Sequence, residues 1–378
     1  MNQRYNKIME WKRNAFDYFN MDIQQSCLKY FERSDVVDLV SSKLSGGLEL
    51  RIFQTFLLDT RGSGVNPFHT LDREKHLLAA AKEGHFGAVE WLYNCMKGDP
   101  KTGDARVFAQ ICREAASGGQ LEILKWAHEK GCPCNESTCT NAVKNGHLDC
   151  LKWAHENGYP LDKETCIYAA RGGHLKCLKW ARHNGGIWDA RTCSHAAFSG
   201  HLECLRWAHD NGCPLSDQTC TYAAEGGHLE CLKWAREHGC HLNKIDTCAK
   251  AAQGGNVECL KWARENGCGW DARTCTNAAY TGHLDCLKWA RENGCDWDAR
   301  TCTYAAFNGH LDCLKWAHEN GCPWDKETCV YAARGGHLEC LKWAHENGCT
   351  LDKDTCTNAA EWGNLECLKW ARENGCPE

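Results

Sequence analysis

A repeat of 27 residues constrains the fold of this chain more than any other feature of its sequence. The stretch TCTYAAFNGHLDCLKWAHENGCPWDKE at 301–327 recurs with small changes from about Cys112 to the C-terminus. A fixed repeat of this length predicts one elongated stack in which each repeat contacts only its neighbours. The length of 378 residues therefore reflects how many repeats the chain contains, and not how many globular domains it forms.

Each regular repeat is numbered from a cysteine at position 1. These positions are Cys112, Cys139, Cys166, Cys193, Cys220, Cys248, Cys275, Cys302, Cys329 and Cys356. Positions 1, 4, 5 and 8 hold Cys, Ala, Ala (Val143 once) and Gly, and this i, i+3, i+4, i+7 stripe predicts one face of a short first helix. Positions 10 to 19, LDCLKWAHEN in one repeat, predict a second helix with one wide apolar face. Because helices of about ten residues are marginal alone, their stability must come from stacking.

Helix-capping residues support these boundaries. From the repeat of Cys139 onward, the residue four before position 1 is Asn135, Asp162, Asp189, Ser216, Asp271, Asp298, Asp325 or Asp352, with Asn243 one residue further back because of an insertion at 243–246. All of these side chains accept hydrogen bonds from the amides at a helix start. The first helix is predicted to end at the glycine of position 8, such as Gly309, and the second at a glycine such as Gly321.

The ends of the stack differ from the regular repeats. A degenerate repeat starts near Leu77 and brings the number of repeats to eleven, and the Gly, Pro and Asp content of 96–107 predicts an exposed excursion after it. Residues 1–75 do not follow the repeat, and their apolar patches predict helices at 7–18, 35–44 and 48–58 before a loop at 60–70. We expect an all-α fold in which 1–75 form a small helical segment that covers the first repeat, and 76–378 form a solenoid.

The motif Ala-Ala-x-x-Gly-His-Leu-Glu-x-Leu-Lys, followed by an apolar pair and Glu-x-Gly, resembles the ankyrin repeat over about 76–378. The resemblance implies an ankyrin-like helical solenoid of about eleven helix-turn-helix units that binds protein partners. Ankyrin repeats are typically 33 residues long and open with Thr-Pro-Leu-His, whereas this repeat opens with Thr-Cys-x-x-Ala-Ala and joins its units by about eight residues, as at 321–328. The residues missing here come from the β-hairpin finger, which weakens the expectation of binding through finger tips.

Composition excludes several classes of partner. The net charge of −5 and pI of about 6.4 give no field that would draw the chain to nucleic acid or an anionic membrane. No apolar run reaches the roughly 18 to 20 residues that span a bilayer, and 1–20 contain no apolar core of a signal peptide. We expect a soluble protein made in the cytosol, and a nuclear location is compatible with this composition.

The 30 cysteines follow the repeat at positions 1, 12 and 21, apart from Cys27, Cys95 and Cys134. Position 12 is once Ile123, and position 21 is once Tyr159 and once Gly186, replacements that a zinc ligand or a half-cystine would not tolerate. We therefore expect buried, reduced thiols that pack as small hydrophobic side chains, with no metal and no cofactor.

Histidine at position 9 and tryptophan at position 15 are assigned structural roles. Gln120, Asn256 and Asn364 replace the histidine, and all three side-chain types can hydrogen-bond backbone at the start of the second helix, so a histidine ladder for metal is not expected. The tryptophans lie on the apolar face of the second helix and are predicted to be core residues. The charged positions 11, 14, 17 and 18 predict a solvated convex face.

Positions 3 and 6 of the first helix vary between repeats and lie opposite the Cys/Ala stripe, so they are predicted to face a partner. Tyr, Phe and Arg are common there and dominate protein–protein hot spots. Exposure of Phe198, Tyr280 and Phe307 to water would cost free energy, and a surface without a binding role has no need of such exposed apolar side chains. The candidate partner-binding residues are Asn141, Lys144, Tyr168, Arg171, His195, Phe198, Tyr222, Glu225, Lys250, Gln253, Asn277, Tyr280, Tyr304, Phe307, Tyr331, Arg334, Asn358, Glu361 and, at position 7, Trp362.

These features favour a non-catalytic scaffold that binds a protein along the concave face of the first helices. One alternative is a substrate-recruiting adaptor, for example of a ubiquitin ligase, docked through 1–75, although no motif there supports it. Another is single-stranded RNA recognition, one base per repeat, which the mixed charges at position 6 disfavour. Nothing departs from the repeat in a way that builds an enzyme site. The last repeat keeps apolar residues and adds Trp362, so we also expect self-association or partner docking at the C-terminal end.

Overall fold

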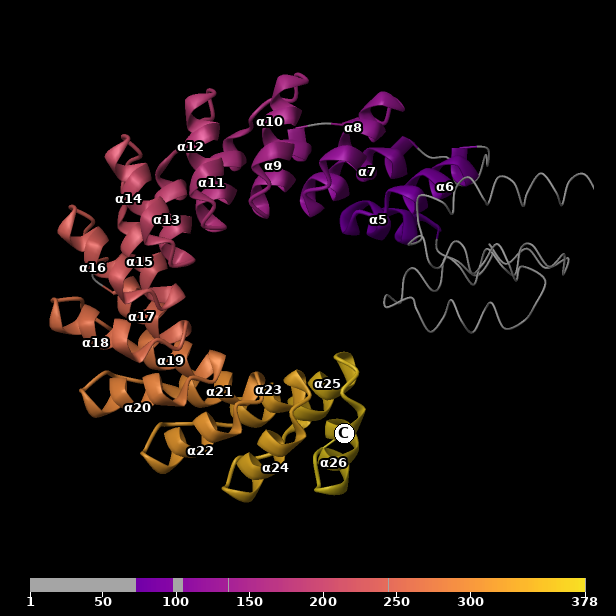
Figure 1. Ribbon diagram of the computed structural model, residues 1–378. Helices are drawn as coiled ribbons and strands as arrows, with labels where there is room; N and C mark the ends of the chain where they lie inside the picture. Colours follow the sequence, from indigo (N-terminus) through magenta and orange to yellow (C-terminus); the bar gives the residue numbers. More distant parts are fainter. Residues whose placement is uncertain (1–72, 98–104, 135, 244, 378) are drawn as a thin grey trace, which may run out of the picture. The chain divides into compact units, whose positions relative to one another are not determined.

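The computed structural model describes residues 73–97, 105–134, 136–243 and 245–377 (Figure 1). The helices expected at 7–18, 35–44 and 48–58 and the loop at 60–70 lie outside these residues, as do 98–104 of the expected excursion. Within the described residues every regular element is a helix, which confirms the all-α prediction. None of the described helices is long and apolar enough to cross a membrane.

The described helices alternate between the first and the second helix of a repeat. The first helices are α5 (Arg73–Glu83), α7 (Ala105–Gly118), α9 (Glu136–Lys144), α11 (Lys163–Arg171), α13 (Ala190–Phe198), α15 (Asp217–Gly226), α17 (Asp246–Gln253), α19 (Ala272–Thr281), α21 (Ala299–Phe307), α23 (Glu327–Gly335) and α25 (Lys353–Glu361). The second helices are α6 (Phe86–Lys97), α8 (Leu121–Glu129), α10 (Leu148–Glu156), α12 (Leu175–His183), α14 (Leu202–Asp210), α16 (Leu229–Glu237), α18 (Val257–Glu265), α20 (Leu284–Glu292), α22 (Leu311–Glu319), α24 (Leu338–Glu346) and α26 (Leu365–Glu373). These pairs correspond one to one to the repeats expected from the sequence.

The chain divides into two compact bodies within the repeat formed by α11 and α12. The N-terminal body runs to Ala169 and includes Lys176–Ile187, whereas the C-terminal body comprises Ala170–Leu175 and Trp188–Glu378. Helices α13 to α26 therefore belong to the C-terminal body. Each body is described below by itself.

The predicted capping residues start most first helices. Asp189, Asp271 and Asp298 each accept a hydrogen bond from the backbone amide two residues later, at 2.9 to 3.0 Å. Asn243 was predicted to cap α17, and this prediction is wrong, because the helix begins only at Asp246. The inserted residue of this repeat lengthens the linker, so the N-cap position passes to Ile245, which has no capping side chain.

Two layers of unequal packing form the C-terminal body. The first helices lie side by side in close contact, whereas the second helices of neighbouring repeats barely touch (Figure 1). Cysteine and the alanine pair allow the close approach of the first layer, as at Cys302, Ala305 and Ala306, which are all fully buried. Tryptophan at position 15 holds the second helices further apart. This body therefore curves with its first helices on the inner, concave side.

The core prediction is confirmed at the thiols of positions 1 and 12. Cys193 at position 1 and Cys204 at position 12 are 0% and 1% exposed, and Leu205 beside them is fully buried. Burial raises the pKa of Cys231 to about 11 and, helped by Asp285, that of Cys286 to about 12. At neutral pH these position-12 thiols stay protonated, which suits their role as small hydrophobic side chains.

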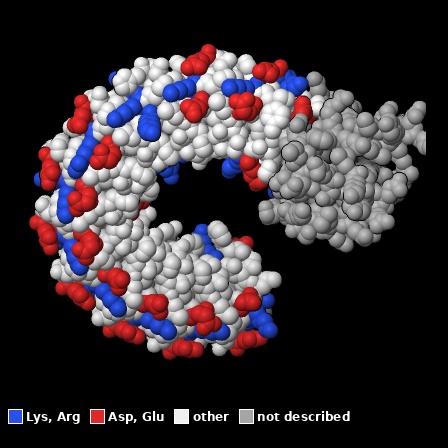
Figure 2. All heavy atoms as spheres, viewed as in Figure 1, with Lys and Arg blue, Asp and Glu red and all other residues white. Residues whose placement is uncertain are grey.

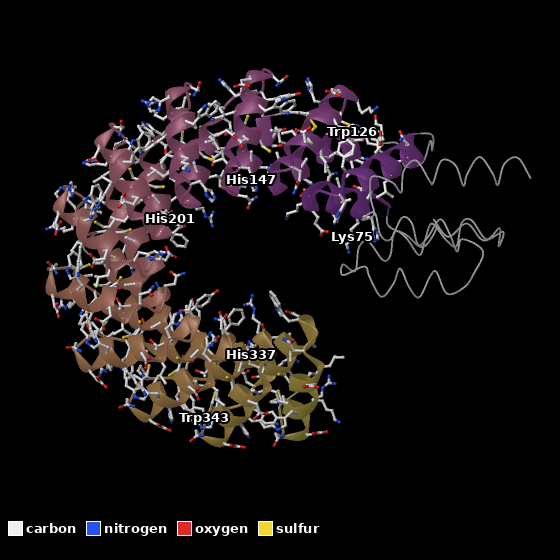
Figure 3. All side chains as sticks on the ribbon, viewed as in Figure 1. Lys75, Trp126, His147, His201, His337 and Trp343 are labelled. Carbon is white, nitrogen blue, oxygen red and sulfur yellow. A yellow bond between two sulfur atoms is a disulfide. The ribbon has the colours of Figure 1, made fainter. Side chains whose placement is uncertain are left out.

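The side chain of position 9 ties each repeat to the preceding one. His147 Nε2 lies 3.1 Å from the carbonyl oxygen of Ser117, at the end of the preceding first helix, and Asn364 donates to the carbonyl of Arg334 at 2.8 Å. The structural role was predicted correctly, but the bonding site was not, because the predicted bond lay at the start of the second helix. The imidazole instead satisfies a helix-end carbonyl that the neighbouring repeat leaves open. Figure 3 labels His147, His201 and His337.

Two glycines of one repeat allow a matched stability test of this tie. Gly309 and Gly321 both have left-handed backbone, with φ of +75° and +81°, and a Cβ built on Gly309 would collide with the imidazole of His337, whereas one built on Gly321 meets nothing within 4 Å. We expect Gly321→Ala to cost about 1 kcal/mol for the backbone conformation alone. Gly309→Ala should cost about 1–3 kcal/mol more, because it also overpacks the contact with His337. Urea unfolding of both variants measures the difference, and equal midpoints would contradict the inter-repeat contact.

Burial of this histidine ladder predicts a loss of stability in acid. Burial lowers the pKa of His201, His228 and His310 below the ordinary value of histidine. The unfolded chain therefore takes up protons at a higher pH than the folded chain, so the free energy of unfolding should fall as pH drops from about 7 through the folded pKa values.

The variant H201N/H228N/H310N should unfold with a weaker pH dependence between pH 7.5 and 5.5, because asparagine already makes the same tie at Asn256 and Asn364. Chemical unfolding across this pH range measures the slope. An unchanged slope in the triple variant would show that the acid sensitivity arises elsewhere.

Candidate functional site

None of the residues predicted to face a partner is buried. They are Asn141, Lys144, Tyr168, Arg171, His195, Phe198, Tyr222, Glu225, Lys250, Gln253, Asn277, Tyr280, Tyr304, Phe307, Tyr331, Arg334, Asn358, Glu361 and Trp362. In the C-terminal body the charged side chains gather over the second helices, while the side made by the first helices is mostly uncharged (Figure 2). The variable positions therefore lie on a weakly charged concave surface.

Side chains on this surface pair across repeats according to one rule: position 6 of one repeat meets position 3 of the next. The Lys144 ammonium lies 4.3 Å from the ring centroid of Tyr168. The Glu225 carboxylate lies 3.1 Å from the Lys250 ammonium. The residue types at the two positions are therefore complementary, as a cation with a ring and as an acid with a base.

Aromatic pairs follow the same rule and form a row in the C-terminal body. The ring centroids of Tyr280 and Tyr304 lie 5.8 Å apart, as do those of Phe307 and Tyr331, both with edge-to-face geometry. Since Tyr304 and Phe307 lie three residues apart on α21, the two pairs are contiguous. We call Tyr280, Tyr304, Phe307, Tyr331, Arg334 and Trp362 the aromatic row; it crosses α19, α21, α23 and the end of α25.

Arg334 is the one cation of the aromatic row. Its guanidinium lies 4.6 Å from the ring centroid of Trp362 and 5.7 Å from that of Tyr331. Its Nε is buried and has no hydrogen-bond partner among the described residues. The rings hold the guanidinium in place, so the row combines apolar area with a positioned hydrogen-bond donor.

The solvent exposure of the aromatic side chains on the first helices differs from the prediction. Tyr280 and Trp362 are 43% and 56% exposed, but Phe198 and Phe307 are only partly accessible. Tyr222 covers Phe198 at a centroid distance of 6.1 Å. The expectation that Phe198 and Phe307 are exposed is therefore wrong, because the next repeat supplies an aromatic neighbour. A comparison of position 6 with position 3 of the following repeat would have revealed this pairing.

The convex side fits the structural roles assigned to it. Glu and Lys three residues apart on second helices form ion pairs, with nitrogen–oxygen distances of 3.1 Å between Glu230 and Lys233 and 2.9 Å between Glu258 and Lys261. Tryptophans of position 15 pack between second helices, where His318 meets Trp343 edge-on at 5.6 Å. This surface is solvated and regular, and it offers little variation for recognition.

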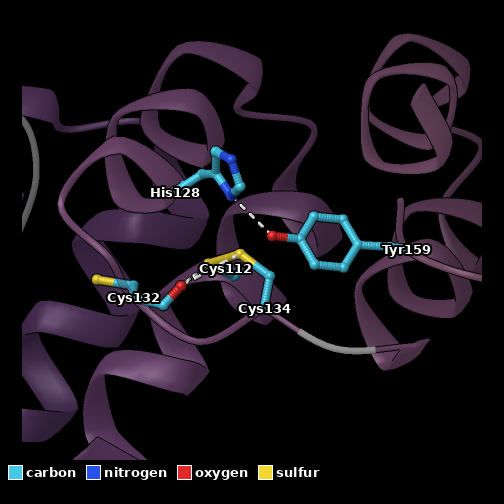
Figure 4. Close-up of a disulfide and its surroundings, with 5 residues drawn as sticks. All are labelled: Cys112, His128, Cys132, Cys134 and Tyr159. Atoms are coloured by element: carbon cyan, nitrogen blue, oxygen red, sulfur yellow. Dashed lines mark hydrogen bonds between the residues drawn. A yellow bond between two sulfur atoms is a disulfide. The ribbon is translucent and has the colours of Figure 1, made fainter. Parts of the chain in front are cut away.

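One cysteine pair departs from the expected reduced thiols. A disulfide joins Cys112 on α7 to Cys134 in the linker before α9, with the Cα atoms 5.6 Å apart (Figure 4). The prediction of reduced thiols throughout is wrong here. It rested on replacements at positions 12 and 21, whereas Cys134 occupies position 23, which is Leu or Trp in the next eight repeats. Within the described residues, no group of three or more His, Cys, Asp or Glu side chains could hold a metal ion.

Family comparison identifies the repeat. The model described as "Ankyrin repeats (many copies)" matches residues 112–155, 139–182, 220–264 and 275–318, which together are less than half of the chain. The chain carries ankyrin repeats. In each matched segment the helix pair of the ankyrin repeat is present, with the short linker of the 27-residue form.

Comparisons with individual proteins add little to the family match. No curated protein matches the sequence significantly. The human ASB11 ankyrin repeat domain is 21% identical and covers 47% of this chain and 96% of its own, with a TM-score of 0.39. The pentatricopeptide repeat protein PPR10, solved with an 18-nucleotide psaJ RNA element, is 15% identical and covers 96% of this chain and 62% of its own, with a TM-score of 0.38. Likenesses this weak decide nothing about function.

Proposed function

We propose that the chain is a non-catalytic protein-interaction scaffold, and that the aromatic row is the centre of its binding surface. The observation that carries the proposal is a continuous run of aromatic side chains on a weakly charged concave face. The two ends of the row remain accessible, with Tyr280 43% and Trp362 56% exposed. Large aromatic side chains and arginine are the residues that contribute most to protein–protein affinity.

The packed rings of the aromatic row form one continuous surface. Such a surface suits a folded or helical surface of the partner better than separate point contacts would. Rings that already pack against each other lose little side-chain freedom on binding, which lowers the entropic cost of association. Arg334 would supply direction, because the rings of Trp362 and Tyr331 hold its guanidinium in place, and a guanidinium forms strong hydrogen bonds to carboxylates. Charged variable residues of the same body, such as Glu225 and Lys250, would form a polar border to the row.

The RNA alternative receives less support from the same face. A phosphate-binding stripe needs several unpaired cations in series. Here Lys250 is paired with Glu225, and Arg334 is stacked on Trp362. The ubiquitin-ligase alternative depends on residues 1–72, which lie outside the described part of the chain, and it stays a prediction. Self-association at the C-terminal end also stays a prediction, although Leu365 there is 70% exposed.

The test of the proposed function is capture of a partner by the chain and by the variant Y304A/F307A/Y331A. We expect the variant to lose the partner, because the centre of the row is removed. Its stability should fall by about 0.5–1.5 kcal/mol for each of the two broken aromatic pairs, beyond the lost apolar burial. A pulldown from a lysate with quantitative mass spectrometry measures capture, and thermal unfolding measures stability.

The matched control is K288A/K315A/K342A, which changes the convex side of these two repeats and of the repeat before them. This control should capture the partner as the unchanged chain does. Equal capture by both variants would refute the assignment of the face. A salt titration against random RNA distinguishes the alternative, since tight binding that weakens steeply with salt would favour nucleic acid.

A further inference from the structure

The Cys112–Cys134 disulfide and the neighbouring Cys132 have no part in the proposed function. Cys132 lies two residues before Cys134, and its carbonyl oxygen lies 4.0 Å from the sulfur of Cys112 and 3.7 Å from that of Cys134 (Figure 4). Pro133 separates the two linker cysteines. The two sulfur atoms of the disulfide and the carbonyl of Cys132 therefore meet between α7 and the linker that follows α8, while the Cys132 sulfur points away from them.

Accessibility distinguishes Cys134 from the other cysteines. Among the described residues with placed side chains, every other cysteine is buried, whereas Cys134 is partly accessible. Part of Cys134 is open to solvent in the folded repeat, whereas Cys112 at the other end of the disulfide is buried. Accessible disulfides are generally the labile ones, while buried structural disulfides resist reduction.

Comparison with a sister repeat shows that the disulfide fits the architecture of the repeat. Cys193 and Cys213 occupy the same positions, 1 and 21, as Cys112 and Cys132, and the Cys193 sulfur also lies 4.0 Å from the Cys213 carbonyl oxygen. Cys193 forms no disulfide, and Leu215 holds its position 23. The sulfur of position 1 therefore keeps the same place against the linker whether it is a thiol or a half-cystine.

In the reduced state, both thiols would find a hydrogen-bond acceptor nearby. A half-cystine sulfur has no hydrogen to donate, but after reduction the thiols of Cys112 and Cys134 can both donate to the Cys132 carbonyl beside them. The two redox states thus differ by one covalent bond and by these two hydrogen bonds, and the core of the repeat need not be rebuilt.

We propose that Cys112 and Cys134 form a reversible thiol–disulfide exchange site for small-molecule thiols and disulfides of the glutathione class, with Cys134 as the attacked sulfur. In reduction, the thiolate of one glutathione attacks the Cys134 sulfur and displaces Cys112, which takes up a proton. A second glutathione thiolate attacks the mixed disulfide on its glutathione sulfur and releases glutathione disulfide, and Cys134 takes up a proton. Two glutathione thiols are thereby oxidised and one protein disulfide is reduced; oxidation runs the same steps in reverse.

The bond would control the attachment of the linker before α9 to the first helix α7. Closed, it fixes the junction between the first regular repeat and the next; open, it releases Cys134 from α7. The site therefore makes the N-terminal body responsive to the redox state, independently of the aromatic row in the C-terminal body.

The experiment equilibrates the full chain in buffers of graded glutathione to glutathione disulfide ratio and blocks accessible thiols without denaturation. Peptide mass spectrometry then quantifies the Cys112–Cys134 cross-link at each ratio. We expect the cross-link to appear and disappear reversibly within the range of ratios, with one mixed-disulfide adduct at Cys134, while Cys193 and Cys213 remain thiols. A cross-link that never forms, or one that glutathione never reduces in the folded chain, would overturn the proposal.

Two variants locate the site. Cys134→Leu restores the residue of the sister repeats, so it should keep the fold, as measured by circular dichroism, and lose both the cross-link and the adduct. Cys132→Ser keeps both reacting sulfur atoms and should keep the redox response. Loss of the response in Cys132→Ser, or a redox-dependent cross-link that survives in Cys134→Leu, would show that the assignment of the reacting cysteines is wrong.

Discussion

The close approach of neighbouring first helices is the constraint on which the rest of the C-terminal body depends. Fully buried cysteine and alanine, as at Cys302, Ala305 and Ala306, leave no room for a larger side chain between these helices. Because tryptophan holds the second helices further apart, the two layers differ in spacing and the stack must curve. The curvature brings the variable side chains of adjacent repeats together on the concave side. The aromatic row is therefore a consequence of how small the core residues are.

Polar groups at the repeat junctions are satisfied by the neighbouring repeat. The position-9 side chain bonds to the end of the preceding first helix, as His147 does to Ser117. Many position-21 thiols donate to a carbonyl before the first helix of their own repeat, as Cys322 does to Asp298 at 3.4 Å. Short helices leave a high proportion of backbone groups open at their ends. A repeat with such short helices and linkers can be stable only because these groups find partners in the stack.

A nearly identical core lets single departures from the repeat acquire new chemistry. Cys134 stands where leucine or tryptophan elsewhere packs toward the next repeat, as Trp297 does against Trp316 at a centroid distance of 5.8 Å. The shorter side chain does not make that contact, and its sulfur bonds to Cys112 instead. On the concave face, variation has a different effect, because each change at position 6 meets position 3 of the next repeat. The side chains proposed to bind a partner therefore also make the inter-repeat pairs.

The sequence by itself determined the repeat length, the two helices of each repeat, most caps and the buried thiols, because these depend on spacing within about 27 residues. It also placed the variable residues on one face. Only the tertiary structure decided which residues of different repeats meet: Phe307 with Tyr331, Arg334 with Trp362, His147 with Ser117 and Cys112 with Cys134. These contacts depend on the distance and rotation between helices that are stacked in space. A periodic sequence pattern identifies the face on which a residue lies, but the partner it meets there depends on how the repeats stack.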